Sequence, residues 1–156
     1  PQVPAEVLAG QSQPGKGWSV ASPEEAARRS VYVHIKRSLA LPILATHDAA
    51  DTDSSCPVRY TTTVPTQALG LLNGAFSNEQ AERLADRLAA DVPGDLPGQV
   101  RRAVLLTTSR EPTAEETEKD VAFVRSLREE AGLSERAALV QYALLSLNAN
   151  AFLYID

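Results

Sequence analysis

From residue 65 onward, helix start and stop signals follow one another at short intervals, and this pattern restricts the fold most. Capping boxes and prolines open helices, whereas Asn-Gly, Pro-Gly and single glycines end them. The connections between these signals are short, which favours antiparallel neighbouring helices. The signals in chain order are Pro65, Asn73, Gly74, Ser77 with Gln80, Pro93, Gly94, Pro97, Thr113 with Glu116, Gly132 and Ser134.

The apolar residues between these signals recur at helical spacing, so the sequence predicts a mainly α fold, a compact bundle of about five helices. The last of these segments, ERAALVQYALLSLNA, is apolar around most of its circumference and is expected at the centre of the core. We expect residues 65–148 to form the stable core. The expected core side chains are Leu69, Leu72, Leu84, Leu88, Val104, Val121, Leu127, Leu139 and Leu145.

The N-terminal part has a different composition. Residues 1–22 are rich in Pro, Gly, Gln and Ser around a single Trp18, which indicates an extended arm from a preceding domain, followed by one mainly helical domain over 23–156. Ser22 is expected to cap a short helix from about 23 to 30. In VYVHIKR, alternating apolar residues predict one short strand. The alternative is one continuous helix over 23–40.

Residues 46–64 form a long polar segment without helix or strand periodicity. Such a segment inside a compact domain is either functional or held by side-chain hydrogen bonds. Its Asp, Ser and Thr side chains can fix turns by bonding nearby backbone amides. We therefore favour an ordered structural connector, with Cys56 as a small buried side chain.

The net charge of -5 has the wrong sign for a module that neutralises many phosphates, so nucleic acid is not an expected partner. No apolar run approaches the roughly 20 residues of a transmembrane span. One cysteine permits no internal disulfide, and the absence of methionine indicates a piece of a longer protein. No cofactor motif for haem or phosphate occurs, so we expect no cofactor in this chain.

The acidic residues Asp48, Asp51 and Asp53 are the candidate metal ligands, because carboxylates at such spacing can converge on a hard cation such as Ca²⁺ or Mn²⁺. The pattern is not an EF-hand, since Cys56 stands where that loop requires glycine. The simpler interpretation is that these aspartates accept hydrogen bonds in turns and salt bridges.

The basic residues Arg28, Arg29, Lys36, Arg37 and Arg59 form a candidate anion site, or they pair with the acidic residues of the connector. We favour the internal salt bridges because the chain is acidic overall.

His34, His47 and Cys56 raise the alternative of a Cys/His nucleophile or a zinc site. Spacing alone does not bring them together, and a buried inert thiol with a surface His34 is the simpler interpretation.

The stretch EEAARRSVYVHIKRSLALPILATHDAADTDSSCPVRYTTTVPTQALGLLNGAF, followed by SREPTAEE and a terminal LLSLNANAFLYID, resembles a family. The family is the C-terminal domain of unknown function in large envelope proteins of planctomycetes and related bacteria. The similarity extends from about Val7 to Asp156. His47, where an aromatic is expected, and Ala151, where Glu is expected, depart from the family pattern.

The resemblance implies context rather than a reaction. It places the chain in the periplasm or at the cell surface, attached to other domains of the same polypeptide, with haem in a separate upstream cytochrome-c-like module. The preferred function is a non-catalytic assembly or docking domain that binds those domains or a protein partner. The alternative is part of a hydrolase or carbohydrate-processing enzyme, in which the aspartates serve as metal ligands or as an acid/base pair and Arg59 binds an anion.

Overall fold

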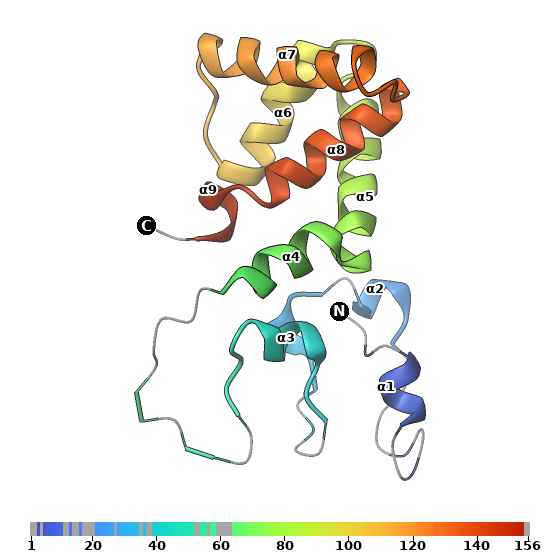
Figure 1. Cartoon of the computed structure of the whole chain (residues 1–156), viewed down its shortest axis with the longest axis vertical. Helices are drawn as coiled ribbons and strands as arrows, with labels where there is room; N and C mark the ends of the chain where they lie inside the picture. Colours follow the sequence, from blue (N-terminus) through green and yellow to red (C-terminus); the bar gives the residue numbers. More distant parts are fainter. Residues whose placement is uncertain are drawn as a thin grey trace. The chain divides into compact units, whose positions relative to one another are not determined.

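The computed structural model describes residues 3, 5–10, 13, 16, 21–26, 28–34, 36, 39–51, 54–55, 57–58 and 64–154. The described chain is mainly helical, which confirms the predicted fold class (Figure 1). Its internal contacts divide it into two compact units, residues 1–67 and residues 68–156. We describe each unit by itself. The expected division into an arm over 1–22 and one domain over 23–156 stays a prediction.

The first unit contains short helices. They are α1 (Ala5–Ala9), α2 (Pro23–Ala26), the 3₁₀ helix η1 (Ser30–Tyr32) and α3 (Pro42–Thr46). The helix α1 lies where an extended arm was expected. Ser22 caps α2 as predicted: the Glu25 amide donates to Ser22 Oγ at 3.2 Å, and the Ser22 amide donates to Glu25 Oε2 at 3.1 Å. The helix ends four residues earlier than expected.

The strand predicted from the alternation after Ser30 is wrong over the described residues of that segment. Ser30–Tyr32 forms a 3₁₀ turn in which the Tyr32 amide donates to Arg29 O and the Val33 amide donates to Ser30 O, each at 3.0 Å. These local bonds take the place of the backbone hydrogen bonds that a partner strand would make with a β-strand here. The only strand-like pairing among the described residues is an isolated bridge between Lys36 and Leu39.

The second unit is the helical core. After α4 (Pro65–Asn73), which begins in the first unit, come α5 (Ala75–Asp91), α6 (Leu96–Thr108), α7 (Ala114–Glu129), α8 (Glu135–Leu147) and the short α9 (Asn150–Leu153). The most extensive packing joins α5 to α8, and α6 packs on α7. In Figure 1, α5 begins and α8 ends toward the same end of this unit, where α4 and α9 are attached.

Most predicted helix ends are confirmed. Thr113 and Glu116 form the full capping box of α7, and Ser134 caps α8 by accepting from the Ala137 amide. The capping box predicted at Ser77 is wrong, because α5 begins two residues earlier, after Gly74, and Ser77 is a buried residue inside the helix. The Asn78 side chain then donates to Leu72 O and Gly74 O and holds the turn between α4 and α5.

The buried core lies between α5, α6, α7 and α8. Of the predicted core residues, Leu88, Val121 and Leu139 are buried, and Leu84, Val104 and Leu127 are partly buried. The complete cluster is Ala81, Ala85, Leu88, Val100, Ala103, Val121, Val124, Ala138, Leu139, Tyr142, Ala143 and Leu144.

Three predicted core residues are exposed instead: Leu69, Leu72 and Leu145. The helix α4 buries none of its residues within the described structure. On α8 the buried face contains Ala138, Tyr142 and Ser146, four residues apart, and Leu145 lies off that face. A helix that is apolar on most sides therefore leaves some of its leucines in contact with solvent.

Candidate functional site

Asp48, the first candidate aspartate, ends a turn in the first unit. It has a φ of 54°, the left-handed region that Asp and Asn tolerate better than most residues. The side-chain nitrogen Nε2 of Gln67 donates to Asp48 Oδ2 at 3.3 Å and to Thr46 O at 3.1 Å. Gln67 Oε1 accepts from the Val64 amide at 3.3 Å. One side chain of α4 thus connects the two ends of the segment between Asp48 and Val64, which is the structural role predicted for a connector.

The second candidate aspartate also acts as an acceptor, since Asp51 Oδ2 accepts from Ser54 Oγ at 2.7 Å. This bond fixes a local turn, as Asp and Ser side chains in connectors commonly do. His47 Nδ1 donates to Ile43 O at 2.8 Å, which caps the end of α3. Asp53, Cys56 and Arg59 lie outside the described residues, so their roles stay predictions.

Three of the five basic candidate residues, Arg28, Arg29 and Lys36, lie in the described part of the chain. The Arg28 guanidinium lies over the Tyr32 ring, 5.7 Å from its centroid, in a cation–π contact. Arg29 precedes η1 at its N-cap. Lys36 Nζ donates to Lys16 O at 3.1 Å. Arg37 and Arg59 lie outside the described residues, so an anion site or a salt-bridge network with the aspartates stays a prediction.

Among the described residues, no group of three His, Cys, Asp or Glu side chains is arranged so that it could hold a metal ion. Likewise, no helix in the described part of the chain is long and apolar enough to cross a membrane.

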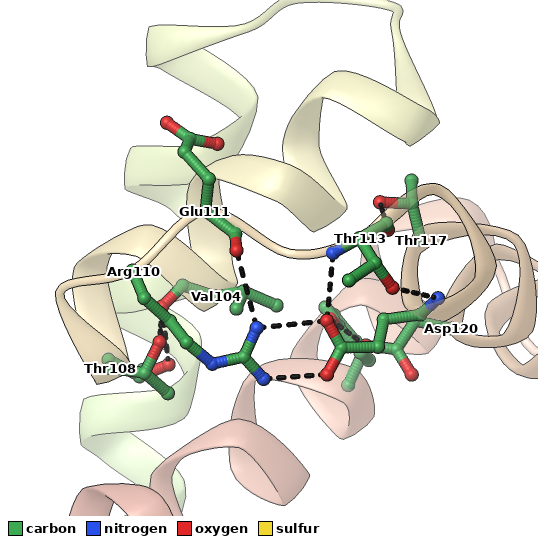
Figure 2. A network of polar contacts seen from close by, with 10 residues as sticks. Val104, Thr108, Arg110, Glu111, Thr113, Thr117 and Asp120 are labelled. Carbon is green, nitrogen blue, oxygen red and sulfur yellow. Dashed lines mark hydrogen bonds and ion pairs between the residues drawn. The ribbon is translucent and has the colours of Figure 1, made fainter.

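A polar network lies at the start of α7 (Figure 2). Arg110 donates through Nη1 to Glu116 Oε2 at 2.9 Å and through Nη2 to Glu116 Oε1 at 2.6 Å. The Thr113 amide donates to Glu116 Oε2 at 2.8 Å. The hydrogen bonds from Arg110 and then from Thr113 lower the pKa of Glu116 to about 2, from its usual 4.5. The network fixes the connection between α6 and α7 and is structural.

Two further polar pairs join neighbouring helices, one partly buried and one at the surface. The Tyr142 hydroxyl of α8 donates to Asp120 Oδ2 of α7 at 2.7 Å, and burial, followed by this hydrogen bond, raises the pKa of Tyr142. Arg136 of α8 donates to both carboxylate oxygens of Asp86 on α5, at 2.9 and 3.1 Å. The hydrogen bond from Arg136 lowers the pKa of Asp86. Both pairs orient α8 and need no functional explanation.

A set of exposed large apolar side chains in the second unit is the feature that packing does not explain. Its side chains come from α4, the first turn of α5, the last turn of α8, α9 and the residue after it. Leu69 is 56% exposed, Leu72 44%, Leu145 49% and Phe152 45%. We name this set of side chains the apolar end. Its residues are Leu69, Leu72, Phe76, Leu145, Phe152 and Tyr154.

The expectation of a buried α4 missed these side chains, although the sequence contains an indication of them. Residues 60–78 contain no charged side chain, and neither do residues 137–155, in a chain in which 22% of all residues are charged. Helices on a solvent-exposed surface normally carry charged residues on their outer face. The lack of charge in these two stretches thus agrees with the exposed apolar side chains that α4, α8 and α9 carry.

The first unit thus contains aspartates that accept hydrogen bonds, and the second unit is a helical core with exposed apolar side chains. Residues 5–124 match a known protein family, described as PSD1, protein of unknown function (DUF1553). The match covers most of the chain, so the chain belongs to this family. No curated protein and no solved structure is significantly similar to it.

Proposed function

We propose that this chain is an assembly or docking module, without catalysis of its own, in a multi-domain protein of the bacterial envelope. The observation that carries the proposal is the apolar end. Large exposed apolar patches on soluble domains are typical of interaction surfaces. By contrast, two aspartates in the described part of the connector accept hydrogen bonds: Asp48 from the Gln67 side chain, and Asp51 from Ser54.

The wider context rests on the sequence resemblance to C-terminal domains of planctomycete envelope proteins. On that basis the full polypeptide resides in the periplasm or at the cell surface and has a haem module upstream. The absorption spectrum tests this part of the proposal. The full-length protein should show a haem band, and the isolated chain should show none.

The docking role is tested by site-specific thiol labelling. Leu72→Cys places a reactive thiol on the apolar end, where Leu72 is exposed. In the dilute isolated chain, this thiol should react rapidly. In the full-length protein within its native assembly, it should be protected, as read by peptide mass spectrometry.

Glu118→Cys is the matched control, because Glu118 is exposed on α7, outside the apolar end. Its thiol should react equally fast in both samples. If Cys at position 72 reacts as fast in the native assembly as in the isolated chain, the surface is not covered and the docking role is wrong.

A further inference from the structure

The joint between α4 and α5 consists of one residue, Gly74, whose backbone is extended with φ -67° and ψ 137°. Hydrogen bonds of helical spacing reach this residue from both sides. The Gly74 amide donates to Gly70 O at 2.9 Å, and the Asn78 amide donates to Gly74 O at 3.1 Å. These residues all lie in the second unit. The chain from α4 into α5 is therefore one helical stretch that is interrupted at a single residue.

The interruption leaves the first turn of α5 without partners for its backbone amides. The amides of Ala75, Phe76 and Ser77 have no acceptor within their own helix, and Gly74 supplies no side-chain cap. In a continuous helix, each amide bonds the carbonyl four residues earlier, which for these three amides means the carbonyls of residues 71–73 at the end of α4. Straightening the joint would therefore complete three backbone hydrogen bonds.

The Asn78 side chain holds the interrupted form. Its Nδ2 donates to Leu72 O at 3.3 Å and to Gly74 O at 3.0 Å. It thus occupies a carbonyl that the Phe76 amide would bond in a continuous helix. Glycine at position 74 favours the same form, because a side chain there would run into Gly70 O and because glycine is unfavourable in a helix interior. Asn78 and Gly74 together oppose the bonds that straightening would add.

Little else fixes α4 relative to α5. None of the residues of α4 is buried, and α4 packs extensively on no other helix in the described part of the chain. Elements with few buried contacts rearrange at low cost in free energy. We infer that Gly74 is a two-state hinge, at which α4 and α5 alternate between the bent form and one continuous helix. The exchange of the Asn78 bonds for backbone bonds sets the ratio of the two forms. This hinge does not depend on the docking function proposed above.

The distance between two spin labels measures the straightening. Ala68→Cys and Ala89→Cys place the labels on exposed positions of α4 and α5, in a chain whose Cys56 is replaced by serine. A continuous helix rises about 1.5 Å per residue, so the two labelled positions lie about 32 Å apart in that form. The bent form brings them closer. Pulsed electron–electron double resonance resolves the two distances and their populations.

Asn78→Ala removes the side chain that holds the bent form. It should raise the ratio of the longer to the shorter distance about 5-fold or more, because it removes two hydrogen bonds of the bent form. Gly74→Ala blocks the bent form sterically and should move most molecules to the longer distance. Gly70→Ala is the matched control. A Cβ at Gly70 meets open space, so the ratio should stay near that of the unchanged joint.

Amide hydrogen exchange gives an independent measurement. The amides of Ala75 and Phe76 gain acceptors only in the continuous helix, so they should exchange more slowly in Gly74→Ala than in the unchanged chain. If neither Asn78→Ala nor Gly74→Ala increases the longer distance, the hinge does not exist. A broad spread of distances with rapid exchange throughout α4 would show that α4 melts instead, and this result also overturns the inference.

Discussion

The hydroxyl of Tyr142 donates a 2.7 Å hydrogen bond to Asp120, and this bond joins α8 to α7 beside the apolar core. The Tyr142 side chain is almost fully buried, so its hydroxyl has to find its partner inside the protein. The bond therefore fixes how α8 is rotated about its own axis.

Tyr142→Phe should lower the free energy of unfolding by about 1 to 2 kcal/mol, because it removes the donor to Asp120 while keeping the shape of the ring. Urea unfolding followed by circular dichroism measures the change. Tyr154→Phe is the control, since Tyr154 is exposed and its replacement should have little effect. Equal effects of the two substitutions would contradict the role of the bond.

Truncation of Leu88 should destabilise the protein much more than truncation of Leu72. Leu88→Ala removes a fully buried side chain and should cost about 2 to 5 kcal/mol of unfolding free energy. Leu72→Ala should cost less than about 1 kcal/mol, since much of that side chain is already in water. Thermal unfolding of dilute samples measures the loss of stability in each variant. A large loss at Leu72 would restore the sequence-based prediction that it belongs to the core.

Gly70 and Gly74 form a matched pair of glycines. A Cβ at Gly74 would run into the carbonyl oxygen of Gly70, whereas a Cβ at Gly70 meets open space. Gly74→Ala should therefore destabilise the turn by roughly 1 kcal/mol or more. Gly70→Ala should stabilise α4 by about 0.5 to 1 kcal/mol through helix propensity. Denaturant unfolding checks both, and a stabilising Gly74→Ala would show that the close approach is absent.

Glu116 should give the stability of the second unit a dependence on acid. Its pKa is lowered from 4.5 to about 2 in the folded chain, chiefly by Arg110. The unfolded chain therefore binds the proton first, and the stabilisation, complete above pH 4.5, declines as the pH falls toward 2. Glu116→Gln keeps a capping side chain but cannot ionise, so it should flatten this part of the pH profile.

Thermal unfolding across the acid range measures this profile. Glu118→Gln on the same helix is the control. In this variant, stability should still decline between pH 4.5 and 2 as it does in the unchanged chain. An unchanged acid profile in Glu116→Gln would contradict the role of the Arg110 pair.

Gln67 should protect the Val64 amide from hydrogen exchange, because its Oε1 accepts from that amide. Gln67→Leu removes the acceptor and should speed exchange at Val64. Gln67→Glu replaces the amide oxygen by a carboxylate oxygen, which can accept the same bond from Val64. It loses the Nε2 donor to Asp48, and the Val64 amide should remain protected. Amide exchange followed by NMR distinguishes the variants. Equal rates at Val64 in all three proteins would show that the side chain does not hold the connector.

The helices after residue 64 could be predicted because their ends depend on neighbouring residues. The Thr113 and Glu116 box and the Ser134 cap each act over three positions in the chain, so local sequence contains the information. The strand predicted in VYVHIKR did not form over its described residues, because alternation predicts a strand only where a partner strand exists. Here, the local 3₁₀ bonds formed instead.

The exposed surface was harder to predict because burial depends on distant packing. Arg136 and Asp86 lie 50 positions apart, and no local pattern indicates that they meet. Leu145 was expected in the core because α8 is apolar on most sides, and the packing of α5, α6 and α7 around it decides which side is buried. The absence of charge in residues 60–78 was the one available indication that α4 remains uncovered by this domain.

The packing of α5 against α8 has a consequence for how the chain folds during synthesis. The two helices share the largest contact in the second unit, yet α6 and α7 lie between them in the chain. The packing of α5, with Ala81, Ala85 and Leu88, is therefore completed only after residues 135–147 have left the ribosome. A nascent chain that ends within α7 lacks the helix with which α5 makes its largest contact.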